Sequence, residues 1–310
     1  MSSFHKSVRH EIEQSRIIDG VALSHTIDAE VSDAIFRLEQ ECGQRPHLAV
    51  VVVGEDPASH IYVANKVKRC RKVGIESRKI QLAANVSQET LLGAVEELST
   101  DKSVHGILLQ LPLPQGMDAR EIIHAIDPAK DVDGFHPLNF GRFMAGLDHA
   151  LAPCTPQGCL RLLQTEISDF QGKDATVIGC SNIVGKPMAE LLLQQGCSVT
   201  SVHHLSHDIE GKCRAADIIV AAAGAPQLVK ASWVKPGAVV IDVGINRLRD
   251  LGKKPGIVGD VDFEEVRKVA SAITPVPGGV GPLTISYLLV NTVRAFNNQL
   301  GVFSDEQLKL

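Results

Sequence analysis

A tyrosine and a lysine in the first quarter of the chain could act together on a ligand. Tyr62 and Lys66 stand four residues apart after a valine-rich run, and this spacing places both side chains on one face of a helix. Asp56 and Pro57 are a typical beginning for this helix, and Gly74 is a typical end. A lysine amine on such a face can act as a nucleophile or transfer protons. The spacing alone is also typical of surface residues.

Two further polar residues stand where chemistry is expected. Gln110 ends the apolar run 106–109 and precedes two prolines, and an amide at the carboxyl end of a buried strand is well placed to bind a ligand or another site residue. Asp133 stands in the tight loop 130–136. Two interpretations stay open for this acid. It accepts hydrogen bonds from an amino-substituted heterocycle, or it bonds the backbone of its own turn.

The second half of the chain contains a candidate phosphate-binding turn. A predicted strand at 175–178 is followed by Gly179-Cys-Ser-Asn-Ile-Val-Gly185 and then by a helix. Such a turn offers backbone N–H groups and the positive end of a helix dipole to a phosphate. Gly179 allows the tight turn, and Gly185 allows close contact between the helix and the strand or a pyrophosphate. Ser181 stands near the middle glycine of the usual fingerprint, so an ordinary strand-to-helix turn remains an alternative.

The end of the next predicted strand bears on the choice of cofactor. NAD sites usually have an acid there that binds the ribose, whereas this strand ends on Val202, His203 and His204. An imidazole can donate a hydrogen bond to a 2′-phosphate that a carboxylate would repel, so NADP is favoured and NAD stays possible. The alternative is that both histidines face solvent. Small residues at two later strand ends, 221–224 and 242–246, either let a cofactor approach or pack tightly.

The elements that must position these residues alternate between strands and helices. Such alternation is typical of parallel sheets with helices on both faces, so we predict an α/β fold. The final helix, 283–300, could pack back on the first domain and make it discontinuous. The predicted strands are 48–53, 104–109, 175–178, 198–202, 217–221 and 238–243, and the other predicted helical segments are 91–98, 186–195 and 261–270.

Composition limits the classes of function. The 310 residues are 44% hydrophobic and 22% charged, long enough for two domains. The net charge of −5 gives no reason to expect nucleic acid or a membrane surface as partner. None of the seven cysteines forms a C-x-x-C pair, which fits free thiols in a reducing compartment. We find no secretory signal, membrane-spanning run or metal-binding motif, so a cytoplasmic protein without a metal is expected.

Five motifs occur in an order known from one enzyme family. They are Ser59-x-x-Tyr-x-x-x-Lys66, Gly106-Ile-Leu-Leu-Gln-Leu-Pro-Leu-Pro114, Lys130-Asp-Val-Asp-Gly-Phe135, Pro153-Cys-Thr-Pro156 and Pro275-Val-Pro-Gly-Gly-Val-Gly-Pro282. From about Ile17 to the final helix, the chain resembles the bifunctional methylenetetrahydrofolate dehydrogenase/methenyltetrahydrofolate cyclohydrolases. The resemblance implies that NADP takes a hydride from methylenetetrahydrofolate and that the methenyl product is hydrolysed to formyltetrahydrofolate in the same cleft. It also implies a homodimer that serves one-carbon metabolism and purine biosynthesis.

The resemblance assigns roles to individual residues. Lys66 would be the central catalytic residue and Gln110 would hydrogen-bond to it. Asp133 would anchor the pterin, and Tyr62 would stack on the aminobenzoyl group of folate. The substrate cleft would also be lined by Pro277, Gly278 and Gly279. The implied cofactor contacts are Gly179, Cys180, Ser181, Ile183, Val184, His204, Ala223, Gly224, Ile245, Gly279 and Thr284.

The resemblance also implies a domain division and leaves alternatives. Residues 1–152 with 283–310 would form the folate-binding catalytic domain, and residues 153–282 a Rossmann-like NADP-binding domain with a parallel sheet. Cys180 stands where many members have an arginine that could pair with the 2′-phosphate, so NADP preference would rest on His204 and its neighbours. The alternatives are a dehydrogenase without the hydrolytic step and a non-catalytic nucleotide- or folate-binding protein. Lys66, Gln110 and Asp133 together argue against the first, and the retained Lys66 argues against the second.

Overall fold

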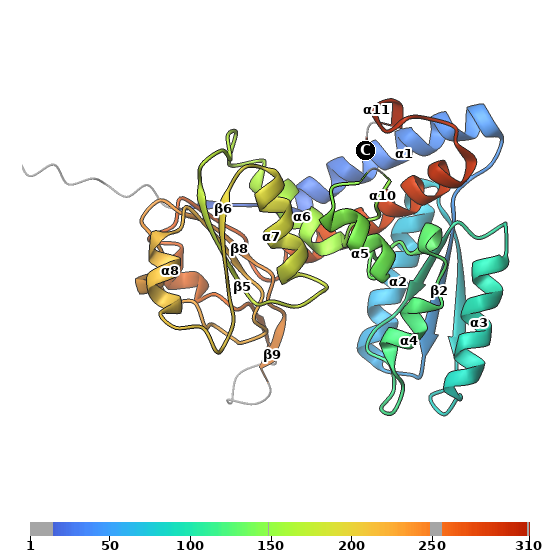
Figure 1. Cartoon of the computed structure of the whole chain (residues 1–310), viewed down its shortest axis with the longest axis horizontal. Helices are drawn as coiled ribbons and strands as arrows, with labels where there is room; N and C mark the ends of the chain where they lie inside the picture. Colours follow the sequence, from blue (N-terminus) through green and yellow to red (C-terminus); the bar gives the residue numbers. More distant parts are fainter. Residues whose placement is uncertain (1–14, 148, 249–255, 309) are drawn as a thin grey trace, which may run out of the picture.

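The computed structural model describes residues 15–147, 149–248, 256–308 and 310, and these form two lobes (Figure 1). The first lobe is built on a parallel sheet of three strands in the order β3-β2-β4. Its strands are β2 (His47–Val53), β3 (Glu76–Leu82) and β4 (Gly106–Leu109). Its helices are α1 (Gly20–Cys42), α2 (Pro57–Val73), α3 (Gln88–Thr100), α4 (Ala119–His124) and α5 (Pro137–Met144), with a short 3-10 turn η1 (Pro128–Lys130).

The second lobe contains a six-stranded sheet in the order β1-β11-β8-β7-β5-β6, in which every paired strand is parallel. Its strands are β1 (Arg16–Ile17), β5 (Asp174–Ile178), β6 (Ser198–Val202), β7 (Ile218–Ala221), β8 (Val239–Asp242) and β11 (Ala272–Ile273). An antiparallel pair, β9 (Asn246–Leu248) and β10 (Gly256–Val258), lies beside it. The helices are α6 (Cys154–Leu163), α7 (Gly185–Gln194), α8 (Ile209–Ala215) and α9 (Phe263–Val266), with a 3-10 turn η2 (Ala231–Trp233).

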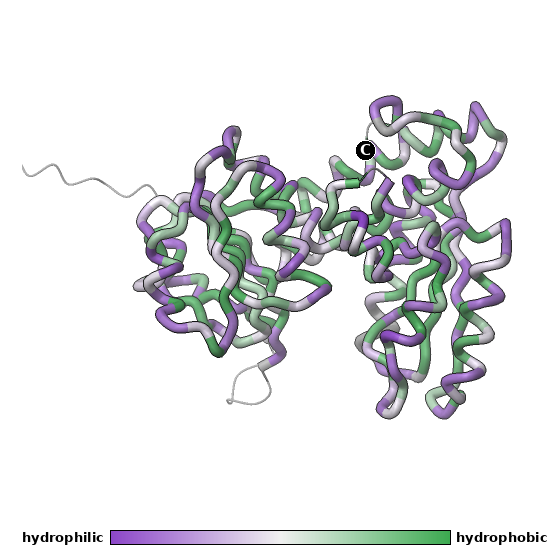
Figure 2. The backbone as a smooth tube through the Cα atoms, viewed as in Figure 1, coloured by the Kyte–Doolittle hydropathy of each residue, from purple (hydrophilic) through white to green (hydrophobic). Residues whose placement is uncertain are grey.

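Burial explains why the central strands consist almost entirely of apolar residues. Strands β4, β7 and β8 are buried along their whole length, as expected where helices cover both faces of a parallel sheet. Figure 2 shows hydrophobic residues along the central strands of both lobes. Among the described residues, no helix is both long and apolar enough to cross a membrane.

The fold confirms the predicted α/β class and the six predicted strands, and it differs elsewhere. The predicted helical segment 261–270 contains only the short helix α9, because Val261 pairs with Val229 in an isolated bridge instead. Helix α1 and strand β3 were not predicted. Helix α1 begins where the side chain of Asp19 accepts the N–H groups of Val21 and Ala22 and ends at left-handed Gly43.

The last long helix joins the two lobes. Helix α10 (Val280–Leu300) is followed by the short α11 (Asp305–Leu308). It packs against both α1 and α6, so it returns to the first lobe as the sequence suggested (Figure 1). Strand β1 connects the lobes in the other direction. It precedes the first lobe in the sequence, but Arg16 and Ile17 pair with Ala272 and Ile273 at the edge of the second lobe's sheet. These two residues therefore lie in the second lobe's sheet, although they stand in the segment 1–152 that the sequence assigned to the first domain.

Candidate active site

A hydrogen bond joins Lys66 to Gln110, two residues that the sequence analysis selected as site candidates. The lysine Nζ donates to Oε1 of Gln110 over 3.1 Å, which joins the middle of α2 to the end of β4. The amide of Gln110 is itself oriented, because its Nε2 donates to the carbonyl of Leu111 over 2.6 Å. The lysine is partly buried. Its ammonium group is therefore fixed at the carboxyl end of the first sheet, where open parallel sheets bind ligands.

The two acids of the loop after η1 have different surroundings. The Asp131 carboxylate is buried and accepts the N–H groups of Phe135 and His136 and the amide of Asn139. It is therefore the aspartate that bonds its own turn. The Asp133 carboxylate accepts no hydrogen bond within the part of the chain that the structure describes. Removal from water raises its pKa to about 6, although the charge of Lys66 opposes this shift.

A buried asparagine on α10 supports the backbone beside Asp133. The side chain of Asn291 donates to the carbonyls of Val132 and Ala152, each over 2.8 Å. It is fully buried, so these bonds satisfy a group that would otherwise be costly to remove from water. The sequence analysis missed this residue. An asparagine inside the apolar run of the last helix was the available signal.

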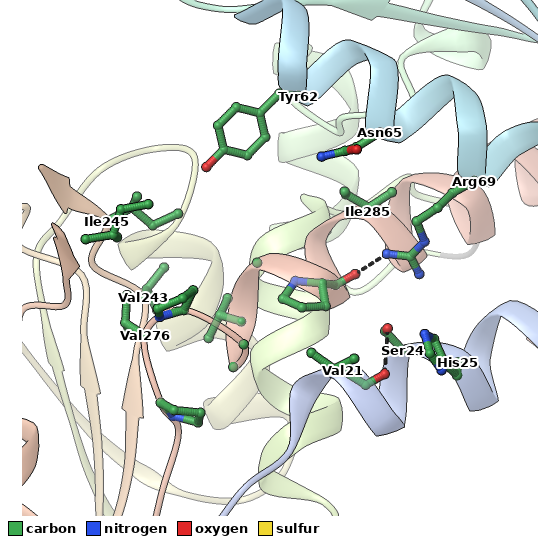
Figure 3. Close-up of a pocket in the computed structure, with 18 of the residues that line it drawn as sticks. Val21, Ser24, His25, Tyr62, Asn65, Arg69, Val243, Ile245, Val276 and Ile285 are labelled. Carbon is green, nitrogen blue, oxygen red and sulfur yellow. Dashed lines mark hydrogen bonds between the residues drawn. The ribbon is translucent and has the colours of Figure 1, made fainter. Parts of the chain in front are cut away.

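A cavity of about 890 Å³ lies between the lobes and includes part of the predicted substrate cleft. Tyr62, Ile245, Pro277, Gly278 and Gly279 all line it. Figure 3 shows Tyr62 extending from α2 toward Ile245 across the opening. Both side chains are exposed, Tyr62 by 41% and Ile245 by 53%. An aromatic ring opposite an apolar side chain suits a flat ligand.

The catalytic candidates adjoin this cavity along α2. Lys66 follows Tyr62 by one helical turn, and its partners Gln110 and Asp133 lie with it outside the lining. The structure thus brings the four predicted residues into one region. Their roles stay predictions.

An ion pair that the sequence analysis missed fixes α2 against the other long helices. Arg69 on α2 forms a salt bridge with buried Asp28 on α1. The same guanidinium donates to the carbonyl of Pro282 over 2.7 Å and to the hydroxyl of Ser286 over 2.5 Å. Arg69 therefore ties α1, α2 and the start of α10 together beneath the cavity. Because its partner is far away in sequence, no local pattern indicated this contact.

The predicted phosphate-binding turn lies between β5 and α7, where the strand order of the large sheet reverses. Gly179 has a φ of +111°, and a Cβ there would lie 2.1 Å from the carbonyl oxygen of Ala222. A Cβ on Gly185 would lie 1.9 Å from the carbonyl oxygen of Gly179. Both glycines are therefore required by the close packing of the turn itself, before any ligand is considered.

The other residues of this turn leave an open surface. The hydroxyl of Ser181 accepts the N–H groups of Val184 and Gly185 over 3.2 and 3.4 Å, so it satisfies two backbone donors where α7 begins. Ile183 is exposed. Cys180 is partly buried, with its Sγ 3.6 Å from the carbonyl oxygen of Val202. The turn thus presents backbone and small side chains at the start of a helix, which suits an anion.

His203 and His204, next to this turn, are used differently. His203 Nδ1 accepts the N–H of Leu205 over 3.2 Å, and the hydroxyl of Ser206 accepts the N–H of His203 over 3.0 Å. The side chains of His203 and Ser206 therefore stabilise the turn after β6. The ring of His204 is exposed and has no hydrogen bond among the described residues. Of the two imidazoles, only His204 has both ring nitrogens available to a ligand.

A buried aspartate that the sequence analysis missed holds the strand end at Ala223 and Gly224. Oδ2 of Asp260 accepts both of their N–H groups, over 2.7 and 2.8 Å. Its Oδ1 accepts the amide of Asn246 over 2.8 Å, and its own N–H donates to Asp242 over 2.8 Å. The two acids therefore fix the segments that follow β7 and β8. Burial raises the pKa of Asp242 to about 6, although three backbone N–H groups oppose this shift.

Thr284, the last of the predicted cofactor contacts, lies one turn into α10. Its hydroxyl is 3.0 Å from that of Thr155 on α6, at the junction of the two lobes. Both residues are partly buried. The structure therefore places Thr284 where the lobes meet but outside the lining of the cavity, and it already gives Thr284 a partner.

Comparisons with known proteins place this geometry in a family. Residues 18–133 match the model of the tetrahydrofolate dehydrogenase/cyclohydrolase catalytic domain, and residues 153–300 match the model of its NAD(P)-binding domain. The bifunctional protein FolD 2 of Paracoccus denitrificans is 53% identical over 90% of this chain and 92% of its own length. The chain belongs to the tetrahydrofolate dehydrogenase/cyclohydrolase family.

Solved structures of family members have the same fold. Bifunctional FolD from Campylobacter jejuni is 48% identical and superposes with a TM-score of 0.87, covering 92% of this chain and 99% of its own. The Trypanosoma brucei dehydrogenase-cyclohydrolase, solved with NADP and an inhibitor, is 38% identical with a TM-score of 0.88, covering 93% and 99%. The predicted family, two-domain fold class and NADP cofactor are thus confirmed.

Proposed function

We propose that this chain oxidises methylenetetrahydrofolate with NADP and hydrolyses the methenyl product to formyltetrahydrofolate in one cleft between the lobes. The comparisons confirm the predicted bifunctional enzyme, because the relatives named as bifunctional FolD proteins match it over nearly their whole length. Two features of the structure support the assignment to residues: the hydrogen bond between Lys66 and Gln110, and the nearby carboxylate of Asp133, which accepts no hydrogen bond from any residue that the structure describes.

The substrate roles follow from the chemistry of these groups. A pterin ring carries an amino group and ring N–H groups, which a carboxylate such as Asp133 can accept. Tyr62 offers an aromatic face to the aminobenzoyl ring, and Pro277, Gly278 and Gly279 form the opposite wall. This arrangement holds the one-carbon bridge near the Lys66 amine. The protein's first contribution is therefore alignment of the reacting atoms.

Lys66 would serve the hydrolytic step. Water adds to the electrophilic methenyl carbon, a proton must leave the adding water, and a ring nitrogen must take up a proton as its bond to carbon breaks. A lysine amine held by Gln110 can relay these protons without losing its position. The preceding oxidation does not need Lys66 as a carrier, because the hydride passes directly from the folate to NADP.

The residues at the second lobe fit a dinucleotide with a 2′-phosphate. Gly179, Cys180, Ser181, Ile183 and Val184 form the turn that would hold the pyrophosphate at the start of α7. His204 would donate to the 2′-phosphate, and the end of β6 has no acid to repel it. Ala223 and Gly224, held by Asp260, would approach the cofactor with their backbone. Ile245, Gly279 and Thr284 would line the side toward the substrate. When bound, NADP accepts the hydride.

Replacing the lysine tests the assignment. Lys66→Met should lower the rate of formyltetrahydrofolate production by roughly a hundredfold or more, the usual contribution of a proton-transfer group. The assay follows the loss of methenyltetrahydrofolate absorbance, and Lys102→Met, an exposed lysine far from the cleft, is the control. Unchanged hydrolysis in Lys66→Met would exclude the proposed role. Reduction of NADP by methylenetetrahydrofolate, compared with NAD, tests the first reaction in the same preparation.

We further propose the division into residues 1–152 with 283–310 and residues 153–282, with β1 as the exception noted above. We also propose that the protein works in the cytoplasm as a homodimer. The family supports the dimer, and the seven free cysteines fit a reducing compartment. Light scattering of the purified chain measures the oligomeric state directly.

A further inference from the structure

The loop that carries Asp133 is held on both sides of this residue. Before it, the carbonyl of Val132 accepts the side chain of Asn291 over 2.8 Å. After it, a Cβ on Gly134 would lie 2.5 Å from the carbonyl carbon of Ala152, so the loop packs directly against the segment that leads to the second lobe. The Asp133 carboxylate accepts no hydrogen bond among the described residues. Its direction therefore depends on how these neighbours are held.

Asn291 on α10 joins the loop to the segment between the lobes. Its Nδ2 donates to the carbonyls of both Val132 and Ala152. The thiol of Cys154 donates to the same Val132 carbonyl over 3.3 Å, but a thiol is a weak donor. The amide is therefore the main polar contact of Val132. Since Asn291 is fully buried, its loss would leave two carbonyls short of a donor in a region removed from water.

Gln157 on α6 orients the amide of Asn291. Its Nε2 donates to Oδ1 of Asn291 over 3.2 Å and to the carbonyl of Ala152 over 2.8 Å. Its Oε1 accepts Nη1 of Arg294 over 3.0 Å. An arginine only donates and a carbonyl only accepts, so each of the two amides has one orientation that suits all its neighbours. These bonds connect α6 and α10 to the loop that carries Asp133.

We propose that Asn291, oriented by Gln157, is a positioning residue that holds the Asp133 carboxylate in the direction needed to bind the pterin. This inference rests on the proposed function, which assigns the pterin to Asp133. Neither Asn291 nor Gln157 lines the cavity, so both act on the folate through the backbone of the loop. Their side chains bond to none of the proposed cofactor contacts. Affinity for the folate should therefore depend on them, and affinity for NADP should not.

The test compares two buried asparagines of α10. Asn297, near the end of the helix, donates to the carbonyl of Phe303 over 2.8 Å and accepts its N–H over 2.9 Å. We expect Asn291→Leu to raise KM for methylenetetrahydrofolate roughly tenfold, the effect of losing one or two hydrogen bonds to the pterin. The Kd for NADP should stay unchanged. Asn297→Leu removes an equally buried amide and should change neither constant. Urea denaturation of both variants compares their losses of stability.

The pH profile distinguishes positioning from a general loss of stability. In the wild type, kcat/KM for methylenetetrahydrofolate should fall as the pH decreases through about 6, where Asp133 takes up a proton. A loop that has lost Asn291 admits water to this acid, which lowers its pKa, so the fall should occur at lower pH in Asn291→Leu. Lys66 and Asp131, the charged groups that act on Asp133, are unchanged in this variant. Asn297→Leu should keep the wild-type profile.

Gln157→Glu is a second variant of nearly the same size as the wild type. It keeps an acceptor for Arg294 but removes the donor that orients Asn291, so KM for methylenetetrahydrofolate should again rise while the Kd for NADP stays the same. An unchanged KM in folded Asn291→Leu or Gln157→Glu would overturn the proposal, as would an equal rise in Asn297→Leu. Either result, with turnover in the wild type, leaves the proposed function standing. Absence of turnover with methylenetetrahydrofolate in folded wild-type protein would overturn both.

Discussion

Asp131 and Asp133 show how much the surroundings of a single residue matter. They stand two positions apart in one loop, yet Asp131 bonds its own turn while Asp133 has no hydrogen bond among the described residues. Burial makes an ionised carboxylate without hydrogen bonds unfavourable, and this raises the pKa of Asp133 to about 6. A ligand that donates hydrogen bonds would stabilise the ionised form. This acid is therefore poised to bind one.

The raised pKa predicts a pH dependence of the folate reaction. Below about pH 6 the Asp133 carboxyl is protonated and loses acceptor capacity, so kcat/KM for methylenetetrahydrofolate should fall as the pH decreases through this value. Above it, the carboxylate is ionised and the rate should reach a plateau. Asp133→Asn should have low activity with no such step. Persistence of the step in Asp133→Asn would assign it to another group, for example Asp242.

His204 gives a second prediction at this scale. His204→Ala should raise the Kd for NADP roughly fivefold, the loss expected for one hydrogen bond of about 1 kcal/mol. Affinity for NAD should not change, because NAD lacks the 2′-phosphate. Titration calorimetry with both cofactors measures the two values. An equal effect on both would mean that the imidazole contacts a part of the cofactor that NAD shares.

At the scale of elements, the buried Arg69–Asp28 pair decides where α2 lies. It joins α1 to α2, and the bonds from Arg69 to Pro282 and Ser286 extend the connection to α10. Tyr62 and Lys66 are carried on the same helix as Arg69. The position of Tyr62 and Lys66 therefore depends on a contact further along the same helix.

Breaking this pair should destabilise the protein markedly. Arg69→Met leaves the buried Asp28 with only the hydroxyl of Ser286 and no cationic partner, so the free energy of unfolding should fall by about 3 kcal/mol or more. Urea denaturation provides the measurement. Arg45→Met is the control, because Arg45 and Glu39 form an exposed pair whose loss should change the stability far less. Similar losses in the two variants would contradict the structural role given to Arg69.

At the scale of the whole molecule, α10 is the element that both lobes share. It begins in the cleft after Gly279 and packs against α1 and α6, with apolar residues buried on nearly every side. Because α10 is apolar on nearly every side, it needs both lobes to cover it, and neither lobe alone would bury all of its apolar surface. The lobes are therefore distinct in topology but share one continuous hydrophobic cluster.

Removing this helix should prevent folding. A chain that ends at Gly279 loses buried side chains including Leu283, Leu289 and Phe296, and the full set contributes about 10 kcal/mol or more, comparable to the stability of a typical protein. We expect no cooperative thermal transition by circular dichroism. A chain that ends at Gly301 keeps α10 and should fold with a lower Tm. A cooperative transition in the shorter chain would show that the lobes fold independently of α10.

The sequence by itself determined the class of fold and the candidate chemistry. Apolar runs and glycine-bearing turns act over a few residues, so they predicted the buried strands and the turn at Gly179. The motifs around Lys66, Gln110 and Asp133 identified the family before any geometry was known. Helix α1 was missed because its buried face includes Ser24 and Asp28, which interrupt the apolar pattern. Strand β3 was missed because it is an edge strand with mostly exposed residues.

Only the tertiary structure decided which of these residues meet. Asp28 and Arg69 are 41 positions apart, and Asp260 holds backbone N–H groups 36 and 37 positions away, so no local pattern could pair them. The structure also distinguished Asp131 from Asp133 and His203 from His204, because hydrogen bonding depends on how the loop closes. Local residue patterns determine elements, and long-range contacts determine which side chains remain available to a ligand.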